Sequence, residues 1–132
     1  MKKQFLIFLL ILIVPAVFAG AFIVNISAES DGENIVVKWT TSQEIDLNYF
    51  VVERRSINSS FGPISENIIA KGSNSNYEFI DQNAYKTTDA VYIYRLKIVS
   101  KNGDIEHSGE ISVSHSVSSV RRTWGSIKAL FR

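Results

Sequence analysis

Apolar and polar residues alternate most regularly over Val91–Val99, a segment that reads VYIYRLKIV. One face of this segment carries Tyr92, Tyr94, Leu96 and Ile98, and the other carries Ile93, Arg95, Lys97 and Val99. A period of two, filled with aromatic and β-branched residues, is typical of a strand with one face in a core. The Asn-Gly pair within Lys101–Asp104 is a strong hairpin signal. It predicts a two-residue turn with positive φ at both positions and a returning strand over Ile105–Val113.

The same period predicts five further strands before this hairpin. They cover Phe22–Ser27, Asn34–Thr41, Tyr49–Arg55, Ile64–Ala70 and Tyr77–Ile80, and Ile64–Ala70 is expected at a sheet edge. The pattern directs Trp39 and Phe50 inward, with Ser42–Leu47 as a polar connection between their strands. Seven short strands separated by turn signals, with no convincing helical period in the body of the chain, predict an all-β sandwich.

The N-terminal residues have the pattern of an export signal. A basic start, Met1–Lys3, precedes the apolar run Phe5–Val14, and Val17 and Ala19 suit the −3 and −1 positions of a cleavage site. This pattern predicts a helical signal peptide cut after Ala19. The alternative is an uncleaved anchor, because Phe5–Val24 has 20 residues without a charge and can span a bilayer. Both alternatives place the rest of the chain outside the cytoplasm.

Composition excludes several classes of protein. The chain of 132 residues has the length of one domain, and the absence of cysteine excludes disulfides and cysteine-based zinc sites. All 13 Asp and Glu lie between Glu29 and Glu110, so the body is mildly acidic and the last fifteen residues are basic. A nucleic-acid-binding domain would instead spread basic charge over one face of the fold.

Several motifs resemble fibronectin type III-like domains. Trp39 lies where these sandwiches have a core tryptophan, and Tyr92–Leu96 resembles their Tyr-x-aromatic-Arg-aliphatic strand. The resemblance implies a seven-stranded immunoglobulin-like sandwich with Tyr92 as a tyrosine-corner residue. The resemblance and the alternation of apolar and polar residues together predict a core that includes Trp39, Phe50, Tyr92, Tyr94 and Leu96. A narrower resemblance, to modules of secreted proteins from Bacteroidetes and related bacteria, rests on the segments WTTSQEIDLNYFVVERR, KGSNSNYEFID and VYIYRLKIVSKNGDIEHS. It implies that Glu44 has a structural role in its loop, although the sorting domain that often follows such modules is absent.

Candidate chemistry is sparse. His107 and His115 have no second His or carboxylate at metal-ligand spacing, and neither a Gly-x-Ser-x-Gly elbow nor a phosphate loop is present. We therefore expect no catalytic residue, no cofactor and no metal. Two surface groups remain as hypotheses. Arg54, Arg55 and Arg95 form either a basic patch or a set of surface ion pairs, and the tyrosines Tyr49, Tyr77 and Tyr85 form either an aromatic binding surface or scattered exposed rings.

The tail, VRRTWGSIKALFR, has an apolar helical stripe. Val120, Trp124, Ile127 and Phe131 recur at helical spacing, and Arg121, Arg122, Lys128 and Arg132 lie mostly off the stripe. A helix of this length that contains Gly125 is marginal alone in water, so we expect it to form on contact. Three alternatives stay open: the tail contacts an anionic membrane surface, it enters a groove on an envelope protein, or it folds back on the sandwich or frays.

The sequence thus predicts three regions: a signal peptide at 1–19, a fibronectin type III-like domain at 20–114, and a linker with a basic amphipathic tail at 115–132. The expected function is a non-catalytic exported module in the periplasm, at the outer membrane or cell surface, or outside the cell, attached through its tail. The alternative is an adhesion or binding module that recognises a glycan or protein through the loops Asn58–Gly62, Lys71–Asn76 and Gln82–Asp89.

Overall fold

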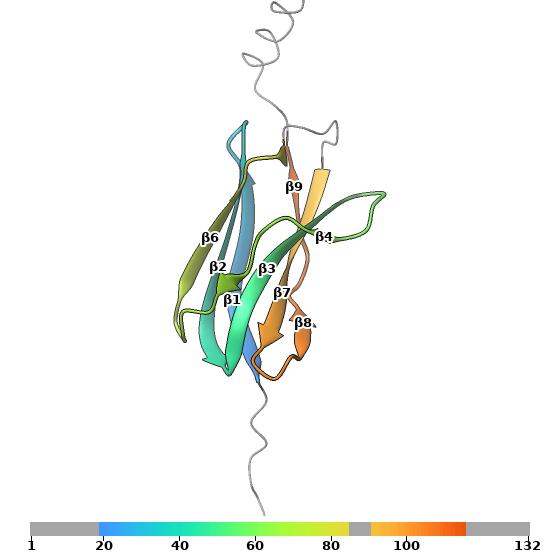
Figure 1. The fold of residues 1–132 in the computed structure, drawn as a ribbon. Coiled ribbons are helices and arrows are strands. Elements are labelled where there is room, and N and C mark those ends of the chain that lie inside the picture. The colour runs from blue at the N-terminus through green and yellow to red at the C-terminus, as the bar shows by residue number, and fades with distance from the viewer. Residues whose placement is uncertain (1–18, 85–90, 116–132) are drawn as a thin grey trace, which may run out of the picture.

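The computed structural model describes residues 19–84 and 91–115, in which nine antiparallel strands form two facing sheets (Figure 1). The smaller sheet has the order β1-β2-β6 and contains β1 (Gly20–Ser30), β2 (Ile35–Ile45) and β6 (Asn76–Asp81). The larger sheet has β3 (Leu47–Ser56) beside β7 (Val91–Ser100) at its centre. The short strands β4 (Gly62–Pro63) and β5 (Ile68–Ile69) pair with β3, and β8 (Ile105–His107) and β9 (Ile111–Ser114) pair with β7. The predicted all-β sandwich is therefore confirmed.

The chain enters and leaves the sandwich at opposite ends (Figure 1). The N-terminal end holds Gly20, the turn between β2 and β3, the loop 71–75 and the turn between β7 and β8. The C-terminal end holds the turn 31–34, the loop 57–61 and His115. Strand β1 runs from one end to the other over 11 residues, a length of roughly 35 Å. The predicted helices near the termini fall on residues 1–18 and 116–132, outside the described part.

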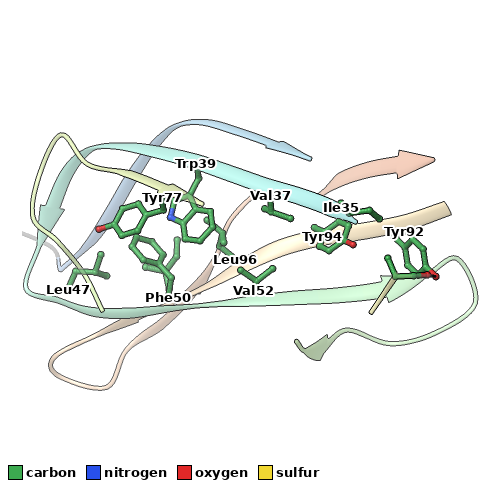
Figure 2. Packing of buried hydrophobic residues seen from close by; sticks show 12 residues of the cluster. Ile35, Val37, Trp39, Leu47, Phe50, Val52, Tyr77, Tyr92, Tyr94 and Leu96 are labelled. Carbon is green, nitrogen blue, oxygen red and sulfur yellow. Dashed lines mark hydrogen bonds between the residues drawn. The ribbon is translucent and has the colours of Figure 1, made fainter. Parts of the chain in front are cut away.

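The core fills the space between the two sheets (Figure 2). The five residues expected there, Trp39, Phe50, Tyr92, Tyr94 and Leu96, are each at most 2% exposed. The rings of Trp39 and Tyr77 stack with their centroids 5.2 Å apart, and Phe50 packs edge-on against both. Each large apolar side chain buried in this way contributes about 1.5–3 kcal/mol, so packing alone can hold a domain without disulfides.

Two of the seven predicted strands are not continuous in the structure. Ile64–Ala70 contributes only β5, with β4 lying just before it, and Ile105–Val113 is divided into β8 and β9. The same serine arrangement accompanies both divisions: the hydroxyls of Ser65 and Ser108 accept the backbone N–H groups of Val52 and Leu96, each at 2.8 Å. Each hydroxyl also donates to the carbonyl of the following residue, so the neighbouring strand keeps its hydrogen bond where the ladder stops.

Two predicted turns differ from the structure. Ser42–Leu47 is not a polar connection: β2 continues to Ile45, Asp46 alone turns the chain with a φ of 47°, and Leu47 is buried in the core. Aspartate tolerates this left-handed conformation better than most residues. In the β7–β8 hairpin only Gly103 has positive φ, so the connection is a three-residue loop with a bulge instead of a two-residue turn.

Candidate functional site

An apolar row crosses the outer face of the larger sheet at the N-terminal end. It consists of Ile69, Tyr49, Val99 and Ile105, which are neighbours in register across β5, β3, β7 and β8. Residues paired across a ladder share a face, and Phe50 and Ile98 point inward, so this row points outward. Ile69 is 66% exposed and Ile105 is 53% exposed, whereas Val99 between them is buried. The sequence alone does not reveal the row, because its four members come from four segments whose register only the structure gives.

Charged side chains occupy the same face nearer the C-terminal end. The Arg95 guanidinium donates to Glu53 at 2.8 Å, and the ring of Phe61 lies against both Arg95 and Arg55. Arg55 is also 3.6 Å from Glu110, and His107 is 3.5 Å from Glu53. Each of these arginines therefore has an acidic neighbour, which favours surface ion pairs over the predicted basic patch.

Arg54 does not belong to that face, which corrects the predicted grouping of three arginines. Position 54 alternates inward with Phe50 and Val52, and Arg54 donates to Asp81 at 2.5 Å at the edge of the core. Tyr94 donates to the same carboxylate oxygen at 2.7 Å. Burial alone would lower the pKa of Arg54, but the hydrogen bond and charge of Asp81 raise it overall. Burial and the neighbouring Asp81 likewise raise the pKa of Tyr94. This cluster holds β6 against β3 and β7.

Glu44 connects the loop 71–75 to the core, which agrees with the structural role that the resemblance implied. Its carboxylate accepts hydrogen bonds from the hydroxyls of Thr41 and Tyr77, and its backbone N–H donates to Ser73. The Tyr77 hydroxyl in turn accepts the backbone N–H of Lys71. Burial, together with the neighbouring Glu44, raises the pKa of Tyr77 to about 12.

The three tyrosines proposed as a binding surface do not form one. Tyr77 is 4% exposed, Tyr49 lies in the apolar row on the outer face of the other sheet, and Tyr85 lies outside the described residues. Tyr92 is buried as well, and its hydroxyl donates to the backbone carbonyl of Ala84 at 2.9 Å. A bond from this tyrosine back to a residue shortly upstream is the geometry of a tyrosine corner.

The two histidines have different surroundings. His107 lies on the outer face beside Glu53, with 41% of its side chain exposed. His115 is 4% exposed, and its Nδ1 shares a hydrogen bond of 2.6 Å with the hydroxyl of Ser30 at the end of β1. Over residues 19–84 and 91–115, no group of three His, Asp or Glu side chains is arranged to hold a metal ion. In the same part of the chain, no helix is long and apolar enough to cross a membrane.

The three loops expected to recognise a glycan or protein are divided between the two ends of the sandwich, and residues 85–89 of the third loop lie outside the described residues. Asn58–Gly62 follows β3 and residues 82–84 follow β6, both at the C-terminal end. Lys71–Asn76 leads into β6, and its residue Ser73 contacts Glu44 at the N-terminal end (Figure 1). A single small ligand cannot contact all three loops. The tail residues Arg121, Arg122, Trp124, Ile127, Lys128 and Phe131 lie outside the described residues.

Comparisons with known proteins support the fold. No family model matches the sequence, and no curated protein matches it. Among solved structures, the chain is similar to an Fn3-like protein from Clostridium thermocellum, with 22% sequence identity and a TM-score of 0.53. The similarity covers 77% of this chain and 99% of that protein. The prediction of a fibronectin type III-like fold is thereby confirmed.

Proposed function

We propose that this chain is a non-catalytic exported module of the bacterial envelope or cell surface. A helical signal peptide over 1–19 directs export, and the basic amphipathic tail attaches the module to an anionic membrane surface or a larger assembly. The sequence resemblance to modules of secreted Bacteroidetes proteins supports export, and the Fn3-like fold, which is typically that of a non-catalytic module, supports the absence of catalysis.

The path of the chain supports this proposal most. The described chain leaves the sandwich at His115, which is hydrogen-bonded to Ser30 at the end of β1 opposite Gly20. His115, the last described residue before the linker and tail, therefore lies roughly 35 Å from the place where the chain enters. A module attached there presents its N-terminal end, with the loop 71–75, away from the attachment.

Vesicle flotation tests the tail. The chain from Gly20 to Arg132 is compared with a chain that ends at Val117, using neutral vesicles and vesicles with anionic lipid. Each basic residue near anionic lipid contributes about 1 kcal/mol, and burial of Trp124 or Phe131 contributes about 1.5–3 kcal/mol. We expect only the longer chain to float, only with anionic lipid, and to gain helical circular dichroism. Flotation of neither chain would contradict membrane attachment, and the tail peptide would then serve as bait for an envelope protein.

The apolar row favours a second candidate function, a surface that binds a protein. Ile69 and Ile105 are more than half exposed on either side of a buried Val99, and exposed apolar groups of this kind mark interaction sites when they are contiguous. We expect Ile105→Lys to reduce retention of the labelled protein on an immobilised envelope extract at least about tenfold, roughly 1.4 kcal/mol. Ile80→Lys is the matched control, since Ile80 is 42% exposed on the other sheet. Equal retention of both variants would contradict this function.

A further inference from the structure

Gly20 and Glu106 meet at the N-terminal end, although they belong to different sheets. Gly20 is the first residue of β1, and Glu106 is the middle residue of β8. Because Glu106 is paired with the inward-facing Ile98, its side chain lies on the inner side of the larger sheet and extends toward β1. A Cβ atom added to Gly20 would lie 3.1 Å from Oε2 of Glu106.

The Glu106 carboxylate has no hydrogen-bond or ion-pair partner within residues 19–84 and 91–115. The neighbouring acid in the β1–β2 ladder, Glu44, lies opposite Ala21 and is already bonded to Thr41 and Tyr77. Lys101 and Asp104 also lie at this end, in the β7–β8 turn, where Asp104 accepts a hydrogen bond from the Asn102 side chain. Glu106 is thus an exposed carboxylate that lies beside Gly20 and makes no ion pair with the described residues.

Position 20 favours glycine for two reasons. Its φ of +144° is a conformation that residues with a side chain rarely adopt. Glycine also leaves free the space beside Glu106 that a Cβ atom would crowd. Cleavage after Ala19 adds one water molecule across the Ala19–Gly20 peptide bond, which leaves a carboxylate on Ala19 and an ammonium group on Gly20.

We infer that Glu106 is the binding site for the Gly20 α-ammonium group that this cleavage creates. The inference rests on the proposed export of the chain and deepens it. Hydrolysis would convert a neutral amide into a cation beside an unpaired carboxylate. The resulting ion pair would join β1 of one sheet to β8 of the other, so the processed chain end becomes a contact between the two sheets.

NMR titration of the Gly20 α-amino group tests the pair. The chain from Gly20 to Arg132 contains every strand of the sandwich and is prepared with a free Gly20 amine carrying an isotope label. An α-amino group ordinarily has a pKa of about 7.7–8.0, and a neighbouring carboxylate raises it. We expect a value at least about half a unit above that range, and a return to it in Glu106→Gln. Glu29→Gln, a matched change at the far end of β1, should leave the raised value intact.

An unchanged pKa in Glu106→Gln would overturn the inference and leave the export proposal standing. Adding Ala19 to the labelled chain moves the amine by one residue, about 3.8 Å, and should weaken the shift. Mass spectrometry of the exported full-length chain tests the premise separately. A mature N-terminus at Gly20 supports both proposals, whereas retention of residues 1–19 in the exported protein would overturn the cleavage on which the inference depends.

Discussion

At the scale of single residues, Asp81 joins the two sheets through side-chain hydrogen bonds. It is 2% exposed in β6, and it accepts hydrogen bonds from Arg54 in β3 and Tyr94 in β7. One carboxylate therefore connects three strands of two sheets. Removing one member of such a buried pair leaves the other charge without compensation, which costs more than the pair itself contributes.

Asp81→Ala should lower the free energy of unfolding by about 3 kcal/mol, because Arg54 then stays partly buried without its partner. Urea denaturation of the purified domain measures this change. Glu78→Ala is the control in the same strand. Its carboxylate is 3.9 Å from Lys38 with both side chains more than half exposed, so a loss below about 1 kcal/mol is expected. Similar losses in the two variants would contradict the special role of Asp81.

Tyr77 gives the domain a sensitivity to base. In the folded chain its pKa is raised to about 12, mainly by burial, whereas in the unfolded chain it is about 10. Between these values the unfolded state has lost a proton that the folded state keeps, so stability falls as the pH rises. We expect the loss of stability between about pH 9 and about pH 11 to be smaller in Tyr77→Phe than in the wild type. Equal losses in the two proteins would show that Tyr77 does not contribute to this sensitivity.

At the scale of elements, the divided strands are set by single hydroxyl groups. Ser65 and Ser108 each accept a backbone N–H of a central strand and donate to the next carbonyl. Their partners, Val52 and Leu96, are both fully buried core residues. Each serine therefore satisfies a strand N–H group at the point where the ladder is interrupted.

Ser108→Ala should cost about 1–3 kcal/mol, because the N–H of Leu96 loses its acceptor. Ser112→Ala in β9 is the matched change, since the exposed Ser112 makes no such bond. Hydrogen exchange reports the effect directly, as the Leu96 amide should exchange faster in Ser108→Ala and at the wild-type rate in Ser112→Ala. Unaltered exchange in both variants would refute this account.

The alternation of the sequence predicted the central strands well, because burial of one face imposes a period of two on β2, β3 and β7. It could not predict the divisions at Ser65 and Ser108, since a serine that replaces a ladder bond looks like any other polar residue in a strand. Leu47 was assigned to a loop because the residues on both sides of it are polar. A single apolar residue among polar neighbours gives no sign that its side chain is buried. The Asn-Gly pair predicted the hairpin, but the side-chain bonds of Asn102 to Asp104 accompany a longer loop.

At the scale of the whole molecule, the apolar row and the contact between Glu106 and Gly20 both depend on which segments of the chain come together. The apolar row needs the register of four strands, and the approach of Glu106 to Gly20 joins residues that are 86 positions apart in the sequence. Neither arrangement leaves a signal in the local pattern. The grouping of Arg54 with Arg55 and Arg95 failed for a related reason: adjacent residues of a strand point to opposite faces, so Arg54 and Arg55 cannot share one.

The positions of Gly20 and His115 at opposite ends also determine how the domain would carry tension. A pull on the two chain ends is directed along the strands, so the hydrogen bonds of a terminal ladder are loaded together in shear instead of being unzipped one by one. Ten residue pairs join β1 to β2, whereas only four join β9 to β7. Under load, β9 should therefore separate first. The strand that leads into the tail would yield before the rest of the sandwich does.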